Sequence, residues 1–321
     1  MRTALVLGIT GGFGRTVANA LVGNGWQIRA LMRDPKKLPP EFSSIDVIHG
    51  DAKNFDDVHR AAAATDLLVY GVNPPKYRWR GVAFPLLENT ARVAEKLGLT
   101  VVFPGNVYNL DPLASPDFSE NSLRRAVTAK GEIREAMEQR LNHASGRGAR
   151  VIVLRLGDFI GSDLGSAWLG QLINRTKTGY ALSAPGPTDL IHTWAYLPDV
   201  GTTVAKLVDL RQQFEPYSEF HFHGHRLSFN DIASAIREAS GLSVTIKAFP
   251  CWVLRIMLPL SGLFRSLLEM RYLWNCEINL NENKLREVLG GNVPHTPIRE
   301  ALLNSGMASG NADSLLETVT I

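Results

Sequence analysis

The stretch that decides the fold is Ala4-Leu-Val-Leu-Gly-Ile-Thr-Gly-Gly-Phe-Gly14. Its apolar start predicts a buried strand over 4–7, and a helical pattern over 13–23 follows the glycines directly. Gly8 and Gly11 permit a tight turn and let the backbone approach a pyrophosphate, while a third glycine permits close packing of helix on strand. The helix N-terminus adds N–H groups and a positive dipole for phosphates. The order strand, loop, helix argues against the alternative, a purely structural glycine turn.

Outward from this loop, short β-rich runs alternate with helical patterns. We expect further strands at 27–32, 46–49, 67–70, 101–103 and 151–156, and helices at 55–64, 82–97 and 123–141. Such alternation implies crossover units and a parallel sheet. The apolar run at 151–156 suits a sheet that is covered on both faces. The expected fold is therefore α/β, a Rossmann-type doubly wound parallel sheet.

The pattern becomes less regular after Gly157. We expect residues 1–180 to form the nucleotide-binding domain, with its sheet completed by segments within 190–230. Residues 181–321 are expected to form mainly a smaller C-terminal part that caps the substrate site. In this part, strand-like runs cover 191–197 and 220–227, and helices are predicted at 200–210 and from Ser228 or Asn230 to Gly241.

The composition restricts the class of protein. Among 321 residues, 34 Lys and Arg face 31 Asp and Glu, so the net charge is 34 − 31 = +3, and no basic block is dense enough to imply a nucleic-acid partner. Two cysteines exclude a disulfide framework and fit a reducing, cytoplasmic location. The apolar stretch 249–268 is interrupted by Arg255 and Arg265, which favours buried helices over membrane contact.

The GxxGxxG spacing with Thr10 ahead of Gly11 resembles the extended and atypical branches of the short-chain dehydrogenase/reductase superfamily, which are NAD(P)-dependent and epimerase/dehydratase-like. The resemblance implies a nicotinamide cofactor and an oxidoreductase or epimerase/dehydratase-like activity on a small organic substrate. It places the pyrophosphate on six residues of the loop: Gly8, Thr10, Gly11, Gly12, Phe13 and Gly14.

Charge at the end of the second strand bears on the choice of cofactor. An NAD site usually carries an acid there, whereas an NADP site offers a cation to the 2′-phosphate. The strand here runs into Arg33, with Lys36 and Lys37 close behind, and Asp34 follows the arginine. Arginine also binds phosphate in a fork and stacks on adenine. We therefore expect NADP(H), with NAD as the alternative.

Other segments match the superfamily where it contacts the dinucleotide. Asp51-Ala52 follows the third strand, where the resemblance implies contact with the adenine amine; helix capping is the competing role. Gly71-Val72-Asn73 resembles the segment with which the superfamily lines the ribose of the dinucleotide. After the fifth strand, Pro104-Gly105-Asn106 occupies the loop at which members of the superfamily carry a catalytic Ser or Thr.

The catalytic pattern is incomplete. Extended members have a YxxxK motif in which the Tyr transfers a proton and the Lys lowers its pKa and binds the nicotinamide ribose. Lys130 falls at the expected place, but Ala126 stands where the Tyr should be. Val107-Tyr108 matches the VY that follows the missing hydroxyl residue. Ordinary Tyr-dependent ketone chemistry is therefore in doubt.

Three interpretations remain open. Lys130 acts as acid/base through a water, as the isoflavone-reductase-like branch implies. Alternatively a tyrosine reaches the substrate, with Tyr108 as the first candidate and Tyr70, Tyr77 and Tyr196 as the others. In the third, the protein does not turn over and is an NADP(H) sensor or scaffold, in which Lys130 binds only the cofactor's ribose.

Further features carry less weight. Three histidines, His221, His223 and His225, would share one strand face, but a polar face is the simpler interpretation and we expect no metal. Bulky residues of the C-terminal part slightly favour an apolar or aromatic substrate: Trp168, Trp252, Met257, Phe264, Met270 and Trp274. The segments 82–97 and 123–141 are the ones through which members of this superfamily often dimerise, so a homodimer is possible by analogy.

Overall fold

The computed structural model describes residues 2–74, 78–161, 168–249 and 268–306, and its centre is a seven-stranded sheet in the order β12-β7-β5-β4-β1-β2-β3. The strands are β1 (Thr3–Leu7), β2 (Gln27–Met32), β3 (Asp46–His49), β4 (Leu67–Tyr70), β5 (Thr100–Gly105), β7 (Arg150–Arg155) and β12 (Tyr217–His221). All six pairings are parallel. The strand order reverses between β1 and β4, which confirms the predicted doubly wound Rossmann sheet.

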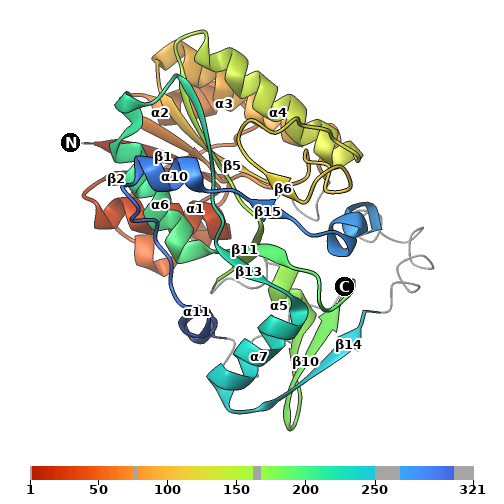
Figure 1. The fold of residues 1–321 in the computed structure, drawn as a ribbon. Coiled ribbons are helices and arrows are strands. Elements are labelled where there is room, and N and C mark those ends of the chain that lie inside the picture. Colours follow the sequence, from red (N-terminus) through yellow and green to blue (C-terminus); the bar gives the residue numbers. More distant parts are fainter. Residues whose placement is uncertain (1, 75–77, 162–167, 250–267, 307–321) are drawn as a thin grey trace.

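Helices cover both faces of this sheet (Figure 1). One face carries α1 (Gly12–Gly23) and α6 (Leu197–Asp209), and the other carries α2 (Phe55–Ala62), α3 (Ala83–Leu97) and α4 (Ala129–Ser145). The alternation along β1 explains the two layers, because Ala4 and Val6 belong to the first core and Leu5 and Leu7 to the second. Burial of both faces makes β1 rigid, and β1 leads directly into the glycine loop.

Helix α4 begins six residues later than the pattern predicts. Its N-cap is Thr128, whose side chain accepts the backbone N–H of Gly131. A Cβ on Gly131 would lie 2.3 Å from the carbonyl oxygen of Tyr108, so this glycine lets the first turn of α4 pack against the loop after β5. The start of α4 therefore decides which of its side chains face the site.

A smaller part lies beside the carboxyl edge of the sheet (Figure 1). It contains two three-stranded sheets, formed by β9 (Ile173–Arg175), β10 (Gly179–Ala184) and β14 (Ser243–Ala248), and by β8 (Asp158–Ile160), β11 (His192–Tyr196) and β13 (His225–Leu227). The helices α5 (Trp168–Leu172), α7 (Phe229–Ser240) and α11 (Ile298–Asn304) belong to it. Trp194, Phe229 and Trp274 form the aromatic centre of its core.

The prediction of a single strand over 220–227 is wrong. The strand is interrupted at Gly224, whose φ is +59° and whose Cβ would lie 2.2 Å from the carbonyl oxygen of Trp194. As a result β12 completes the main sheet, whereas β13 pairs with β11 in a different one. Further elements are β6 (Asp117–Phe118), which pairs with β15 (Asn279–Leu280), and α10 (Asn283–Val288).

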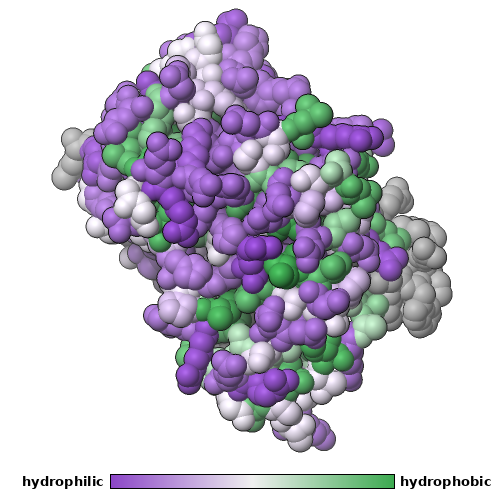
Figure 2. Space-filling model, in the orientation of Figure 1, coloured by the Kyte–Doolittle hydropathy of each residue, from purple (hydrophilic) through white to green (hydrophobic). Residues whose placement is uncertain are grey.

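The surface is mostly hydrophilic over the main sheet and its helices, and more hydrophobic side chains show over the smaller part (Figure 2). No helix within the described ranges has both the length and the apolar character needed to cross a membrane. The apolar stretch 249–268 falls almost wholly outside these ranges, as do Trp252, Met257 and Phe264.

Candidate functional site

Two adjoining cavities open at the carboxyl edge of the main sheet, where β1 and β4 diverge. The first has a volume of about 620 Å³ and the second about 190 Å³. Val72 and Pro74 line both, and the glycine loop contributes Gly8 to Thr10 to the first and Gly11 to Phe13 to the second. A crevice at the switch point of a doubly wound sheet is where dinucleotides bind.

Two positions of the glycine loop have room for glycine alone. Gly8 has a φ of +82°, and a Cβ there would lie 2.4 Å from the carbonyl oxygen of Gly71. A Cβ on Gly14 would lie 2.4 Å from the carbonyl oxygen of Gly8. Gly11 is the N-cap of α1 and supplies no side-chain cap, so the first-turn N–H groups are left for a ligand. The loop therefore fits a pyrophosphate.

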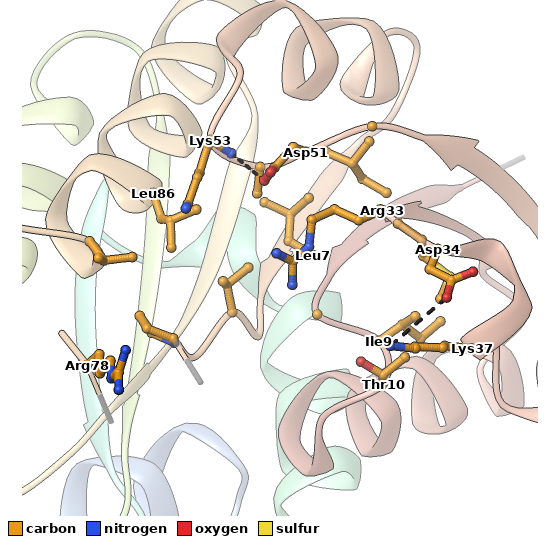
Figure 3. Close-up of a pocket in the computed structure, with 18 residues that line it drawn as sticks. Leu7, Ile9, Thr10, Arg33, Asp34, Lys37, Asp51, Lys53, Arg78 and Leu86 are labelled. Carbon is orange, nitrogen blue, oxygen red and sulfur yellow. Dashed lines mark hydrogen bonds and ion pairs between the residues drawn. The ribbon is translucent and has the colours of Figure 1, made fainter. Parts of the chain in front are cut away.

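Cations surround the first cavity (Figure 3). The Arg33 side chain extends into it from the end of β2, between Asp51 and Lys53 on one side and Asp34 and Lys37 on the other. Asp34 accepts the backbone N–H of Lys36 and lies 4.0 Å from the Lys37 Nζ. Its carboxylate therefore holds the turn after β2, and Arg33 has no such partner within the described part of the chain.

Most of the predicted cofactor residues meet at these cavities. The first is lined by Gly8, Thr10, Arg33, Asp51, Ala52 and Val72, and the second by Gly11, Gly12, Phe13, Gly71, Val72, Asn73, Pro104, Gly105, Asn106 and Tyr108. Gly14 lies just behind the loop, against Gly71. Asp51 accepts the N–H of Lys53, while Asn54 caps α2, so the competing capping role belongs to Asn54.

Lys130 is the exception, because it lines neither cavity. It is buried in the first turn of α4, where its Nζ lies 2.6 Å from a Glu269 carboxylate oxygen and its backbone N–H donates to the other oxygen at 2.8 Å. This pair ties α4 to the C-terminal part. The geometry thus gives Lys130 a carboxylate partner in the C-terminal part.

Arg134, one turn further along α4, faces the second cavity instead. Its Nη2 donates to the Pro104 carbonyl at 2.8 Å, and its guanidinium lies over the rings of Trp79 and Phe103, 5.2 and 4.8 Å from their centroids. Burial lowers its pKa from the usual value, yet the group stays cationic at neutral pH. Sequence reasoning missed Arg134, although its i+4 spacing from Lys130 was a usable signal.

Tyrosines reach the second cavity from two elements. Tyr108 lines it and packs against Trp79, with ring centroids 5.7 Å apart. Tyr70 also lines it but is almost fully buried, which raises its pKa far above the usual range. Tyr196 lines neither cavity, and Tyr77 lies outside the described residues. Among the candidate tyrosines, Tyr108 is therefore the one placed for contact with a ligand.

Asp158, at the start of β8, lines the second cavity as well and was also missed from the sequence. Its side chain makes no hydrogen bond or ion pair with any residue that the structure describes. Burial raises its pKa to about 7, and no charged neighbour contributes to the shift. A carboxyl group that changes protonation near neutral pH is therefore exposed to this cavity.

A buried ionic network supports the floor of the second cavity. Arg155 is fully buried at the end of β7 and donates to Glu219 and Glu138, each at 2.7 Å. It also donates to the backbone carbonyl of Asn106, a cavity-lining residue. Arg124 bridges the same two glutamates. Two positive and two negative charges thus balance inside the fold and fix the loop after β5.

The three histidines do not share a strand face. His221 ends β12 in the main sheet, whereas His225 begins β13. Burial lowers the pKa of His221 to about 3 and of His225 to about 4. No group of three or more His, Cys, Asp or Glu side chains is arranged to hold a metal ion in the part of the chain that the structure describes.

Comparisons with known proteins agree with this geometry. A model of the NAD(P)H-binding family matches residues 8–157. No curated protein sequence matches the chain. Solved structures with the same fold include MoeE5 in complex with UDP-glucose and NAD (TM-score 0.72, 17% identity, covering 95% of this chain and 97% of that one).

Two epimerases are similar in the same way. UDP-N-acetylglucosamine 4-epimerase from Bacillus cereus has a TM-score of 0.71 at 14% identity, with 96% of each chain covered. UDP-glucose 4-epimerase from Thermus thermophilus, in complex with NAD, has a TM-score of 0.68 at 14% identity and covers 97% of this chain and 100% of that one. At such identities the likeness establishes the fold, and the substrates named belong to those proteins. The chain thus shares the Rossmann-type fold of these structures, and its residues 8–157 match the NAD(P)H-binding family.

Proposed function

We propose that the protein binds NADP(H) across the two cavities. The observation that carries the proposal is the pair of cavities on either side of a loop in which Gly8 and Gly14 leave no room for a Cβ atom. In this arrangement the adenosine half occupies the larger cavity, and the glycine loop and the N-terminus of α1 bind the pyrophosphate. Arg33 and Lys37 face the 2′-phosphate, which supports NADP(H) over NAD(H).

The nicotinamide half then occupies the second cavity, where it supplies hydride transfer. The chain's own contribution is position and electrostatics. Arg134 holds a fixed positive charge at the cavity, and Tyr108 and Asn106 line its wall. We propose hydride transfer to or from a small organic substrate, or an epimerase/dehydratase-like reaction, carried out by a cytoplasmic enzyme that works without the Tyr of YxxxK.

A second candidate is a non-catalytic NADP(H) sensor of the same fold. One observation favours it: Lys130, the retained member of YxxxK, is paired with Glu269 rather than placed at the cavity. A sensor would need the cofactor site but no proton-transfer group. The two candidates therefore share the first proposal and differ only in turnover.

A reduction assay separates them. The protein–NADP⁺ complex is mixed with a panel of nucleotide sugars and small aliphatic and benzylic alcohols, and absorbance at 340 nm is followed for one turnover. The enzyme predicts a burst that approaches one reduced cofactor per chain with a member of the panel, and the Arg134→Met variant should lose it. Cofactor binding without a burst across the panel would support the sensor instead.

A further inference from the structure

The second cavity contains one carboxyl group, Asp158, that the proposed function does not yet use. It enters from β8, the first strand after the main-sheet strand β7, through the turn at Leu156 and Gly157. The close approach of Gly157 to the backbone of Thr193 fixes that turn, because a Cβ there would lie 2.0 Å from the Thr193 carbonyl oxygen. Pairing of Asp158 with Trp194 then holds its backbone in a strand. Asp158 is therefore rigidly placed.

Among the residues that the structure describes, none forms a hydrogen bond or ion pair with the Asp158 carboxyl group. Other cavity-lining groups that titrate or carry charge are Arg134 from α4, Tyr70 from β4 and Tyr108 from the loop after β5. The glycine loop and the paired segment of β11 around Trp194 bring no ionisable group to it. The guanidinium of Arg134 is already engaged by Pro104 and two aromatic rings. A cavity-lining carboxyl that has no charged partner among the described residues is a candidate for proton exchange.

The position of Asp158 relative to the cofactor follows from the loop. If the adenosine half lies in the cavity of Arg33, as the proposed function requires, the dinucleotide crosses the glycine loop and its other half enters the cavity of Asp158. Neither position of the YxxxK pattern supplies a proton donor there, because Ala126 replaces the Tyr and Lys130 pairs with Glu269 outside the cavity lining. A carboxyl group in the same cavity can fill that role.

We propose that Asp158 is the proton-exchanging catalytic residue of this site. In the oxidising direction the substrate C–H bond breaks and the hydride goes to the oxidised nicotinamide, while the hydroxyl proton passes to the Asp158 carboxylate and a carbonyl forms. Reduction reverses both transfers. The inference rests on the proposed NADP(H) function and names the residue that carries its proton.

The test needs no substrate, because oxidised and reduced cofactor differ by the positive charge of the nicotinamide ring. That charge favours the ionised Asp158, so NADP⁺ binding should expel the proton and NADPH binding should not. Calorimetric titrations at pH 7 in phosphate and in Tris, which differ in ionisation enthalpy, count the protons released. Both cofactors carry the same 2′-phosphate, so the difference between their proton counts isolates the nicotinamide end.

Wild type should release up to about half a proton more with NADP⁺ than with NADPH, since a group of pKa near 7 is half protonated at that pH. Asp158→Asn should abolish this difference while still binding both cofactors. Asp189→Asn, which removes an exposed carboxylate outside both cavities, should keep it. Equal proton counts for the two cofactors in wild type would overturn the role of Asp158 and leave the proposed function standing.

A second measurement on the unmodified protein covers the case in which Asp158→Asn does not fold. The affinity for NADP⁺ relative to NADPH should rise several-fold between pH 6 and pH 8, and a flat ratio would overturn the inference. If wild type binds neither cofactor, the proposed function fails first and the inference falls with it. The two failures are thus distinguishable.

Discussion

Replacement of Arg155 by methionine removes the central cation of the buried network. The side chain of Arg155 is 0% exposed, and its partners Glu138 and Glu219 are 1% and 6% exposed. In the Arg155→Met variant the two buried carboxylates share only Arg124, so one negative charge remains uncompensated. Methionine matches the length of the arginine stem, and the change therefore tests charge more than packing volume.

Removal of one partner of a buried ion pair costs about 3–5 kcal/mol. The contact between Arg155 and the Asn106 carbonyl adds a further hydrogen bond. Burial opposes ionisation of Glu138, but the guanidinium groups of Arg155 and Arg124 outweigh it and keep its pKa below the usual value. A carboxyl with a depressed folded-state pKa contributes stability that is present above its unfolded pKa and lost as pH falls. The stability that Glu138 contributes to wild type should therefore decline as the pH falls below about 4.3.

Urea unfolding at pH 7, followed by tryptophan fluorescence, measures this cost. Arg140→Met is the matched control, because Arg140 also bridges two glutamates, Glu88 and Glu95, but its partners are 32% and 14% exposed. We expect the control to lose about 1 kcal/mol, as partly exposed ion pairs do. A loss in Arg155→Met no larger than in Arg140→Met would refute the view that this network organises the fold.

Three further predictions concern the loop, the helix and the histidines. Gly8→Ala should abolish NADPH binding and destabilise the protein by more than Gly25→Ala. Both glycines have positive φ (+82° and +76°), but only the Cβ added at Gly8 would collide with backbone atoms. Equal unfolding free energies of the two variants would contradict this geometry. In an NADPH fluorescence titration, Arg134→Met should weaken cofactor binding more than Lys130→Met does. The main effect of Lys130→Met should be a lower thermal stability. The reverse ranking of the two affinities would indicate that Lys130 contacts the cofactor. Burial depresses the pKa of three histidines: His192, His221 and His225. Neutral buried imidazoles stabilise the fold fully above the unfolded-state pKa of about 6.5. Below that pH, the free energy of unfolding should fall by up to about 1.4 kcal/mol per histidine per pH unit. Urea midpoints that stay constant from pH 7 to pH 5 would argue against neutral buried imidazoles.

The fold was predictable because its main signals are local. The strands at 27–32, 46–49 and 67–70 have the bounds that the sequence predicts, because each is a short β-rich run in a regular alternation with helical patterns. The start of α4 could not be predicted, because the segment 123–128 has a helical composition and the helix begins only after the Thr128 cap. The break at Gly224 depends on the backbone of Trp194, which no local pattern reveals.

The site divides in the same way. The glycine loop and Arg33 could be placed from the sequence, because their spacing from a strand fixes their position. Arg134 rather than Lys130 lines the second cavity because of the rotation of α4, and Glu269, the partner of Lys130, is 139 residues away. Asp158 carries no sequence signal, since its character comes from its burial and from the lack of a charged partner among the described residues. Contacts distant in the chain therefore set the part of the site nearest to the chemistry.

Calorimetric titration of wild type, Arg33→Ala and Lys36→Ala with NADPH and with NADH tests the central claim most directly. Arg33 lines the larger cavity and Lys36 does not, although both are exposed cations of the same loop. The account predicts that wild type and Lys36→Ala prefer NADPH and that Arg33→Ala binds NADPH at least about tenfold more weakly, a loss of about 1.4 kcal/mol, with NADH unchanged. Equal affinity of wild type for the two cofactors, or an unchanged preference in Arg33→Ala, would contradict it.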